Sequence, residues 1–254
     1  MSPIALIRHQ LNFDLLIFRR NPAGTFFTVV LPLIFLVIFT SIFGNQTLDN
    51  GAKVATLYVP GILTLAIVSA TAVNVAITMT TRRERGVLKR VRGTPVPGWI
   101  FVLSQALSGV VIALLMTVII SLVGRVLYGV EVQFETLPSL LISLLLGAMA
   151  FSAIGLALTR IITSEDAAPA VTNAIFLPLY FVSGVFVPDT EVPSWVGTVG
   201  NLFPVSHLNK ALQESFDPFA DGAAWPWDHW LVIAGWGIVA AVITLKTFRW
   251  SPNR

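Results

Sequence analysis

The sequence predicts an all-α integral membrane protein with six transmembrane helices, on the strength of three observations. Of its 254 residues, 55% are hydrophobic and only 11% are charged, whereas an ordinary soluble domain is about 25% charged. The apolar residues form runs of about 20 residues, the length at which a helix crosses a hydrocarbon core of about 30 Å. These runs do not alternate strictly between apolar and polar residues, so we expect helices rather than the strands of a membrane barrel.

Residues 3–20 are predicted to form an amphipathic helix on the membrane surface, because apolar residues recur there at helical spacing beside polar ones. The alternative is a frayed tail. The charged residues of this segment also argue against a cleaved signal peptide. The apolar stripe comprises Ile4, Ile7, Leu11, Leu15 and Phe18, and it is flanked by Arg8, Asn12 and Arg19.

Six predicted spans follow this helix within a single transmembrane domain, residues 1–254. Several of them contain proline, which is tolerated in a membrane helix when neighbouring groups satisfy the freed carbonyls. The spans lie at about 23–43, 55–80, 100–124, 137–158, 167–187 and 229–248.

The distribution of cations predicts that both termini face the cytoplasm. In that orientation, only Lys53, Arg125 and Lys210 of the 16 Lys and Arg residues lie outside. Positive residues are retained on the cytoplasmic side of a membrane, so the inverted topology is disfavoured. Trp99 and Trp250 then lie at inner boundaries, where indole rings prefer the headgroup level.

The segment between the fifth and sixth spans, residues 189–218, is predicted to form two short half-helices at the outer face. Trp195 and Val199 share one helical face, Pro204 ends that run, and a second helix is expected from Ser206 to Phe216. Each piece is about half as long as a span, so we expect it to dip into the outer leaflet or to lie on it. The alternative is an ordinary extracellular loop.

The sequence lacks the motifs of several classes of enzyme. Neither G-x-x-x-x-G-K-S/T nor G-x-G-x-x-G occurs, so this chain is not expected to hydrolyse ATP by itself. His9, His207 and His229 are far apart and lack metal-ligand spacing, so we predict no metal site. Ser183 precedes a glycine, but no histidine base is expected beside it in the membrane, and packing of a small residue is the favoured interpretation.

The centres of the spans contain no Asp, Glu, Lys or Arg, which argues against a proton-driven transporter or a channel with charged rings. The polar residues there include Asn74, Thr78 and Asn173. Each of them alone is best explained by hydrogen bonding between helices. Together they would suit a path for a large amphipathic substrate better than a path for an ion.

The loop at residues 82–98 contains six cations within eleven residues, in the sequence RRERGVLKRVRGTPVP. A cytoplasmic position explains the positive sign of this loop. It does not explain Val87, Leu88 and Val91, which form an apolar edge at helical spacing. We therefore predict a short amphipathic helix that a peripheral protein could bind, stopped by the prolines that follow.

Two segments carry a resemblance to a known family. TRRERGVLKRVRGTPVPGWIFVLSQAL resembles the cytoplasmic signature of type-2 ATP-binding-cassette (ABC) permeases, with matches from Arg83 to Pro95. SGVFVPDTEVPSWVGTVGNLFPVSHLNKAL, from Ser183 to Leu212, resembles a second motif of that family. The resemblance covers essentially the whole chain, and it is closest to the daunorubicin-type, multidrug-resistance export permeases.

The resemblance implies a permease subunit of the bacterial inner membrane that exports amphipathic drugs, antibiotics or lipid-like molecules. The partners would be the lipid bilayer, two copies of an ABC ATP-binding subunit, which hold ATP and Mg, and a second copy of this chain or a sister permease. No nucleic acid, and no cofactor bound by this chain, is expected. The alternatives are export of a polysaccharide or lipid-linked glycan, an intramembrane enzyme, which the missing nucleophile–base pairs disfavour, and a structural scaffold.

The resemblance also implies two groups of site residues, and no catalytic residue. The first group would form a coupling helix that binds the ATPase, and it comprises Arg83, Glu84, Arg85, Gly86, Val87, Leu88, Lys89, Arg90, Thr94 and Pro95. The second group would lie near the substrate path, along spans one, two and five, and it comprises Phe27, Leu31, Phe35, Asn74, Asn173 and Phe176.

Overall fold

The computed structural model describes residues 3–43, 46–47, 51–93, 97–187, 193–220 and 222–248. Within these ranges the chain is helical and contains no strand, only an isolated bridge between Thr47 and Lys53. In chain order the elements are α1 (Pro3–Arg20), α2 (Pro22–Thr25), the π-helical turn η1 (Phe26–Val30), α3 (Leu31–Phe43), α4 (Ala55–Val68), the π-helical turn η2 (Ser69–Val73), α5 (Asn74–Glu84), α6 (Val87–Arg92), α7 (Gly98–Tyr128), α8 (Leu137–Leu158), α9 (Ala167–Val182), α10 (Ser194–Gly200), α11 (Pro204–Ser215) and α12 (Trp227–Thr247).

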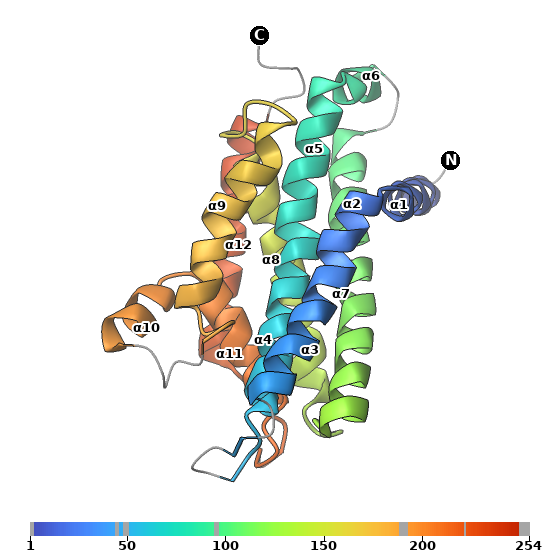
Figure 1. Ribbon diagram of the computed structural model, residues 1–254. Helices are drawn as coiled ribbons and strands as arrows, with labels where there is room; N and C mark the ends of the chain where they lie inside the picture. Colours follow the sequence, from blue (N-terminus) through green and yellow to red (C-terminus); the bar gives the residue numbers. More distant parts are fainter. Residues whose placement is uncertain are drawn as a thin grey trace.

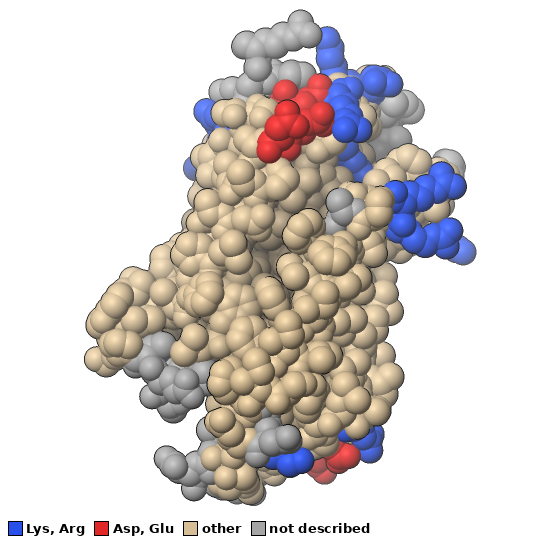
Figure 2. Space-filling model, viewed as in Figure 1, with Lys and Arg blue, Asp and Glu red and all other residues tan. Residues whose placement is uncertain are grey.

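Five helical segments of the described chain are long and apolar enough to cross a membrane, and they run side by side as a bundle (Figure 1). They are Phe26–Phe43, Ala55–Glu84, Gly98–Tyr128, Leu137–Leu158 and Trp227–Thr247. Charged side chains lie mainly at the two ends of the bundle and on α1, with an uncharged band between them on the face that Figure 2 shows. This distribution matches a bundle that crosses a hydrocarbon layer.

The predicted fifth span, 167–187, differs from the helix in the structure. Helix α9 has 16 residues and ends at Val182, so it is shorter than the five spans. Gly184 follows with φ of +71°, in the left-handed region that glycine adopts without strain and that commonly ends helices. The structure therefore supports five spans together with a shorter apolar helix.

The second span is the centre of the bundle, because 72% of its most apolar stretch is buried. Its middle is the turn η2, against which α7 and α8 pack through glycines. A Cβ atom on Gly109 would lie 3.1 Å from the carbonyl oxygen of Ala70, and one on Gly155 would overlap the carbonyl oxygen of Ala72. Small residues allow helix backbones to approach in this way in membrane bundles, where close packing stabilises association.

Helix α11 lies inside the bundle, where it packs against α4, α8 and α12. It begins at Pro204, two residues before the predicted start, and Leu208 and Leu212 are fully buried. The Asn209 amide donates a hydrogen bond of 3.1 Å to the Ser183 carbonyl oxygen and thereby ties α11 to the end of α9. This packing differs from a helix that lies flat on the outer leaflet, whereas the predicted dip into that leaflet stays a prediction for α11. The shorter α10 does project from the bundle (Figure 1), and Trp195 on it is 65% exposed.

The predicted N-terminal helix coincides with α1, which lies across the bundle rather than along it and packs mainly on α7 (Figure 1). Leu15 and Phe18, at its C-terminal end, pack against the main hydrophobic core. Ile4, at its N-terminal end, is 78% exposed. Helix α1 begins, and α12 ends, toward the end of the bundle at which α6 lies (Figure 1).

Replacing Gly155 with alanine is expected to lower the free energy of unfolding by about 1–3 kcal/mol, because the added methyl group would force η2 and α8 apart. Gly235→Ala is the matched control, since nothing lies within 4 Å of a Cβ atom at Gly235. Thermal unfolding of the purified variants in detergent measures the difference. Equal melting temperatures for Gly155→Ala and the wild type would contradict the close contact.

Candidate functional site

The basic segment forms a corner at one end of the bundle, where α5 ends and α6 folds back against it (Figure 1). Gly86 is the turning residue, with φ of +70°. Only glycine adopts this left-handed conformation routinely. We call residues 82–91 the α5–α6 corner, and its charged side chains fall into buried, paired and exposed groups.

Arg83 is buried and binds the chain just beyond the C-terminus of α8. Its guanidinium donates two hydrogen bonds of 2.7 Å, one to the carbonyl oxygen of Thr159 and one to that of Ile162. Carbonyl groups at a helix C-terminus lack partners within the helix and carry partial negative charge. Arg83 therefore attaches the α5–α6 corner to α8, and only 3% of it is exposed for contact with a partner.

Arg82 is also buried, and it joins α5 to α1 and α7. Its guanidinium donates one hydrogen bond of 2.7 Å to the Asp14 carboxylate and one of 2.9 Å to the Gln105 side-chain oxygen. The same guanidinium lies 5.2 Å from the centre of the Phe101 ring, a cation–π distance. Burial raises the pKa of Asp14 above its ordinary value, although the charge and hydrogen bond of Arg82 oppose that rise.

The predicted apolar edge of α6 turns partly toward the bundle. Leu88 is fully buried in a small cluster with four residues of α5, α7 and α8, so a partner protein cannot contact it in this conformation. Val91 packs against the same cluster, and Val87 is half-buried. The other members of the Leu88 cluster are Val75, Met79, Phe101 and Leu156.

The exposed part of the α5–α6 corner is cationic. Lys89 and Arg90 are exposed on α6. Arg85 forms an exposed ion pair of 2.9 Å with Glu165, and Glu84 lies half-buried at 3.3 Å from Arg83. Two further predicted coupling residues, Thr94 and Pro95, lie outside the described residues.

The predicted substrate-path residues occupy two different environments. Phe27 and Asn173 are exposed on the sides of η1 and α9. Leu31 and Asn74 are half-buried, and the Asn74 side-chain oxygen accepts a hydrogen bond of 3.3 Å from Thr78. The remaining two, Phe35 and Phe176, belong to an aromatic cluster.

That aromatic cluster connects α3, α4 and α9. The Phe35 ring lies 5.6 Å from Phe186, which lies 5.9 Å from Tyr180, and Tyr180 stacks on Phe176 at 6.4 Å. Sequence reasoning found Phe35 and Phe176 but missed Tyr180 and Phe186. The spacing of Phe176 and Tyr180 at i and i+4 on the same helix was an available signal for Tyr180.

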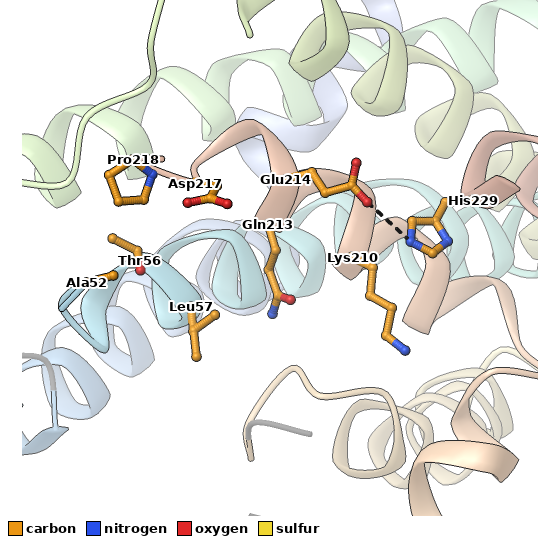
Figure 3. Close-up of a pocket in the computed structure, with 9 residues that line it drawn as sticks. All are labelled: Ala52, Thr56, Leu57, Lys210, Gln213, Glu214, Asp217, Pro218 and His229. Carbon is orange, nitrogen blue, oxygen red and sulfur yellow. Dashed lines mark ion pairs between the residues drawn. The ribbon is translucent and has the colours of Figure 1, made fainter. Parts of the chain in front are cut away.

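A polar cavity of about 310 Å³ lies among α11, α12 and the start of α4. Figure 3 shows Glu214 of α11 facing His229 of α12 across it, and the two side chains lie 3.6 Å apart. Burial raises the pKa of Glu214 above its ordinary value, and the nearby Asp228 and Asp217 raise it further. This cavity is lined by none of the predicted path residues.

Two histidines that are distant in sequence meet beside this cavity. The Nδ1 atoms of His207 and His229 lie 3.0 Å apart, and Nε2 of His207 lies 2.9 Å from the Asn201 carbonyl oxygen. The expectation that the histidines are far apart is therefore wrong for this pair. Within the described part of the chain, no group of three metal-ligating side chains could hold a metal ion.

Sequence reasoning missed the partners of the arginines at the α5–α6 corner, among them two acidic side chains and two backbone carbonyl groups. Asp14 is one of the charged residues at 3–20 that argue against a signal peptide, and in the structure it is the buried counter-charge of Arg82. Asp14 lies on the apolar side of the predicted helix, three residues after Leu11 and four before Phe18, and this was the available signal because a buried carboxylate requires a partner. Glu165 and the Thr159 carbonyl had no comparable signal, since only the tertiary fold brings α8 to α5.

Breaking the buried pair is expected to destabilise the fold. Asp14→Asn leaves the Arg82 guanidinium without its counter-charge, and the loss of one partner of a buried pair costs about 3–5 kcal/mol. The double variant Asp14→Leu with Arg82→Met removes both charges and should recover most of that loss. Thermal unfolding of Asp14→Leu, Arg82→Met and their double variant forms a double-mutant cycle, and Asp14→Asn is measured beside it. Additive losses would show that the two side chains do not depend on each other.

Comparisons with known proteins place the sequence in a family. The model of the ABC-2 type transporter family matches residues 6–216. A daunorubicin resistance ABC transporter permease protein, DrrB1, of Streptomyces coeruleorubidus is 28% identical over 246 residues, covering 91% of this chain and 82% of that protein. The transport permease YvfS of Bacillus subtilis (strain 168) is 24% identical over 77% of this chain and 79% of its own length. The inner membrane transport permease YadH of Escherichia coli (strain K12) is 22% identical over 74% of this chain and 75% of its own length. The chain therefore belongs to the ABC-2 type transporter family and is the membrane subunit of a transporter.

Proposed function

We propose that this chain is the permease of an ATP-driven exporter, which moves amphipathic drugs, antibiotics or lipid-like molecules out of a bacterial cell. ATP and Mg would be bound by a separate ABC ATP-binding subunit, in two copies. One observation carries the proposal beyond family membership. The α5–α6 corner exposes Lys89 and Arg90, while Arg82, Arg83 and Leu88 attach it to the bundle.

The contacts of this corner support a role in coupling. A partner that bound the exposed cations and moved α6 would displace Leu88, which packs on α5, α7 and α8. Arg83 would pass the displacement to α8, and Arg82 would pass it to α1 and α7. Packed helices rearrange between discrete arrangements rather than deforming continuously, so such a displacement could favour an inward-facing or an outward-facing state.

The arrangement of the spans supports a dimeric transporter with a path between two permease chains. In this proposal α9 completes a six-span layout, and both termini face the cytoplasm of a bacterium, in its inner membrane. Large apolar side chains such as Phe27, Ile34 and Phe181 are exposed on η1, α3 and α9, and a second copy or a sister permease would cover them.

The relative DrrB1 is named for daunorubicin resistance, which favours an amphipathic drug as the substrate.

Replacing Lys89 and Arg90 together with alanine is expected to reduce co-purification with the ATPase, and export, by about tenfold or more. Loss of two charge contacts across an interface accounts for a change of this size. Arg125→Ala is the matched control, because Arg125 is an exposed cation at the other end of α7. Pull-down of the ATPase and substrate-stimulated ATP hydrolysis in vesicles measure the effect. Unchanged coupling in the Lys89/Arg90 variant would contradict the assignment of this surface.

The proposed orientation is testable with single cysteines, because the natural chain contains none. A maleimide that cannot cross membranes is expected to label Lys53→Cys in intact cells and to label Lys89→Cys only after the membrane is opened. Both positions are exposed in the structure, so burial does not limit the reaction. Labelling of Lys89→Cys in intact cells would place the α5–α6 corner outside the cell and remove the coupling proposal.

A further inference from the structure

A groove of about 470 Å³ lies between α7, α8 and α12, toward the end of the bundle at which α6 lies. Its volume is within the range of small-molecule sites. It extends along α7 from Gly98 to Ala106, which is about 12 Å at 1.5 Å per residue. In the proposed orientation this stretch is the part of the span that faces the inner leaflet.

The lining of the groove is apolar except for two hydroxyl groups and the indole N–H of Trp99. None of the described residues that line it is charged. The Thr244 hydroxyl is satisfied, because it donates a hydrogen bond of 2.9 Å to the Ala240 carbonyl oxygen. The Ser152 hydroxyl has no hydrogen-bond partner among the residues that the structure describes, and Ser152 is only 1% exposed. A ligand that fits this lining is a hydrocarbon chain with a hydrogen-bond acceptor near one end.

The inner end of the groove favours an anionic group. Trp99 lines the groove and is 57% exposed at the first turn of α7. No described side chain caps this N-terminus, so its free N–H groups can bind a phosphate. The exposed cations Lys89 and Arg90 lie on α6, which packs through Val91 on the same cluster as Phe248, a groove residue.

We propose that this groove binds one acyl chain of an inner-leaflet phospholipid. In this assignment the chain lies along α7, α8 and α12, an ester carbonyl accepts a hydrogen bond from Ser152, and the phosphate lies near Trp99. The groove shares no residue with the predicted substrate path, so this lipid is a bound component rather than the exported molecule.

The bound acyl chain would also contact the hydrophobic cluster on which α6 packs through Leu88. Val102, Leu156 and Phe248 line the groove, and the same three side chains belong to, or pack against, the cluster around Leu88. An acyl chain in the groove would therefore pack against one side of the cluster around Leu88. Without the acyl chain, that side of the cluster has no apolar neighbour in the groove. This consequence rests on the proposed coupling function, whereas the lipid site itself does not.

Photolabelling with a phosphatidylglycerol that carries a diazirine in one acyl chain tests the site in the full transporter, reconstituted in vesicles of that lipid. Labels mapped by mass spectrometry are expected to concentrate on groove residues of α7, α8 and α12. Ala153→Phe fills the groove and should reduce this labelling about tenfold, since each displaced methylene group forfeits burial. Gly235→Phe is the matched control, because its side chain enters open space on the same helix bundle.

Ser152→Ala provides a second variant in case Ala153→Phe fails to fold. It removes one hydroxyl group without adding volume, and it should weaken labelling of the groove while labelling elsewhere on the bundle is unchanged. Labels spread evenly over the lipid-facing surface, with no change in either variant, would overturn the assignment. Labelling of the groove by a photoreactive export substrate, and not by the lipid, would overturn it as well. Because ATP is not required in any of these measurements, their outcome is independent of the coupling proposal.

Discussion

Two buried guanidinium groups at the end of α5 determine how the α5–α6 corner is held. Arg82 and Arg83 are adjacent in sequence, but they point to different neighbours: Arg82 to Asp14 of α1, and Arg83 to the carbonyl groups that follow α8. A buried charge is expensive unless it is paired and hydrogen-bonded. The helices must therefore meet where these partners can be supplied, and α1, α5, α7 and α8 converge at one end of the bundle as a result.

The five cations of the α5–α6 corner do not form one uniform surface. Arg82 and Arg83 are used inside the chain, and Arg85 pairs with Glu165. Lys89 and Arg90 remain exposed, one turn after the left-handed Gly86. A single short sequence thus supplies both the internal attachment of α6 and the positive charge that α6 exposes. Leu88 is buried between α6 and three neighbouring helices, so it belongs to the internal attachment and not to the exposed surface.

Close packing around η2 forms the centre of the bundle. Gly109 and Gly155 allow α7 and α8 to approach the backbone of η2. The buried α11 packs against α4, which is the first part of the second span. Membrane helices gain little from the hydrophobic effect when they associate, so this fit supplies much of their association energy. The groove between α7, α8 and α12 is a gap in the same packing, and it borders the cluster beneath Leu88.

The sequence by itself determined the class of the protein, because hydrocarbon imposes a length and a composition on any chain that crosses it. Helices at 3–20 and 137–158 follow from local pattern alone, and α1 and α8 have the same bounds. The basic segment could be assigned to a family because its motif, Arg83 to Pro95, consists of contiguous residues. Tertiary structure decided what contiguous residues do not encode: that Asp14 pairs with Arg82, that His207 meets His229, that Leu88 faces inward, and that α11 enters the bundle. Each of these contacts joins segments far apart in the chain, and each depends on which helix faces pack together.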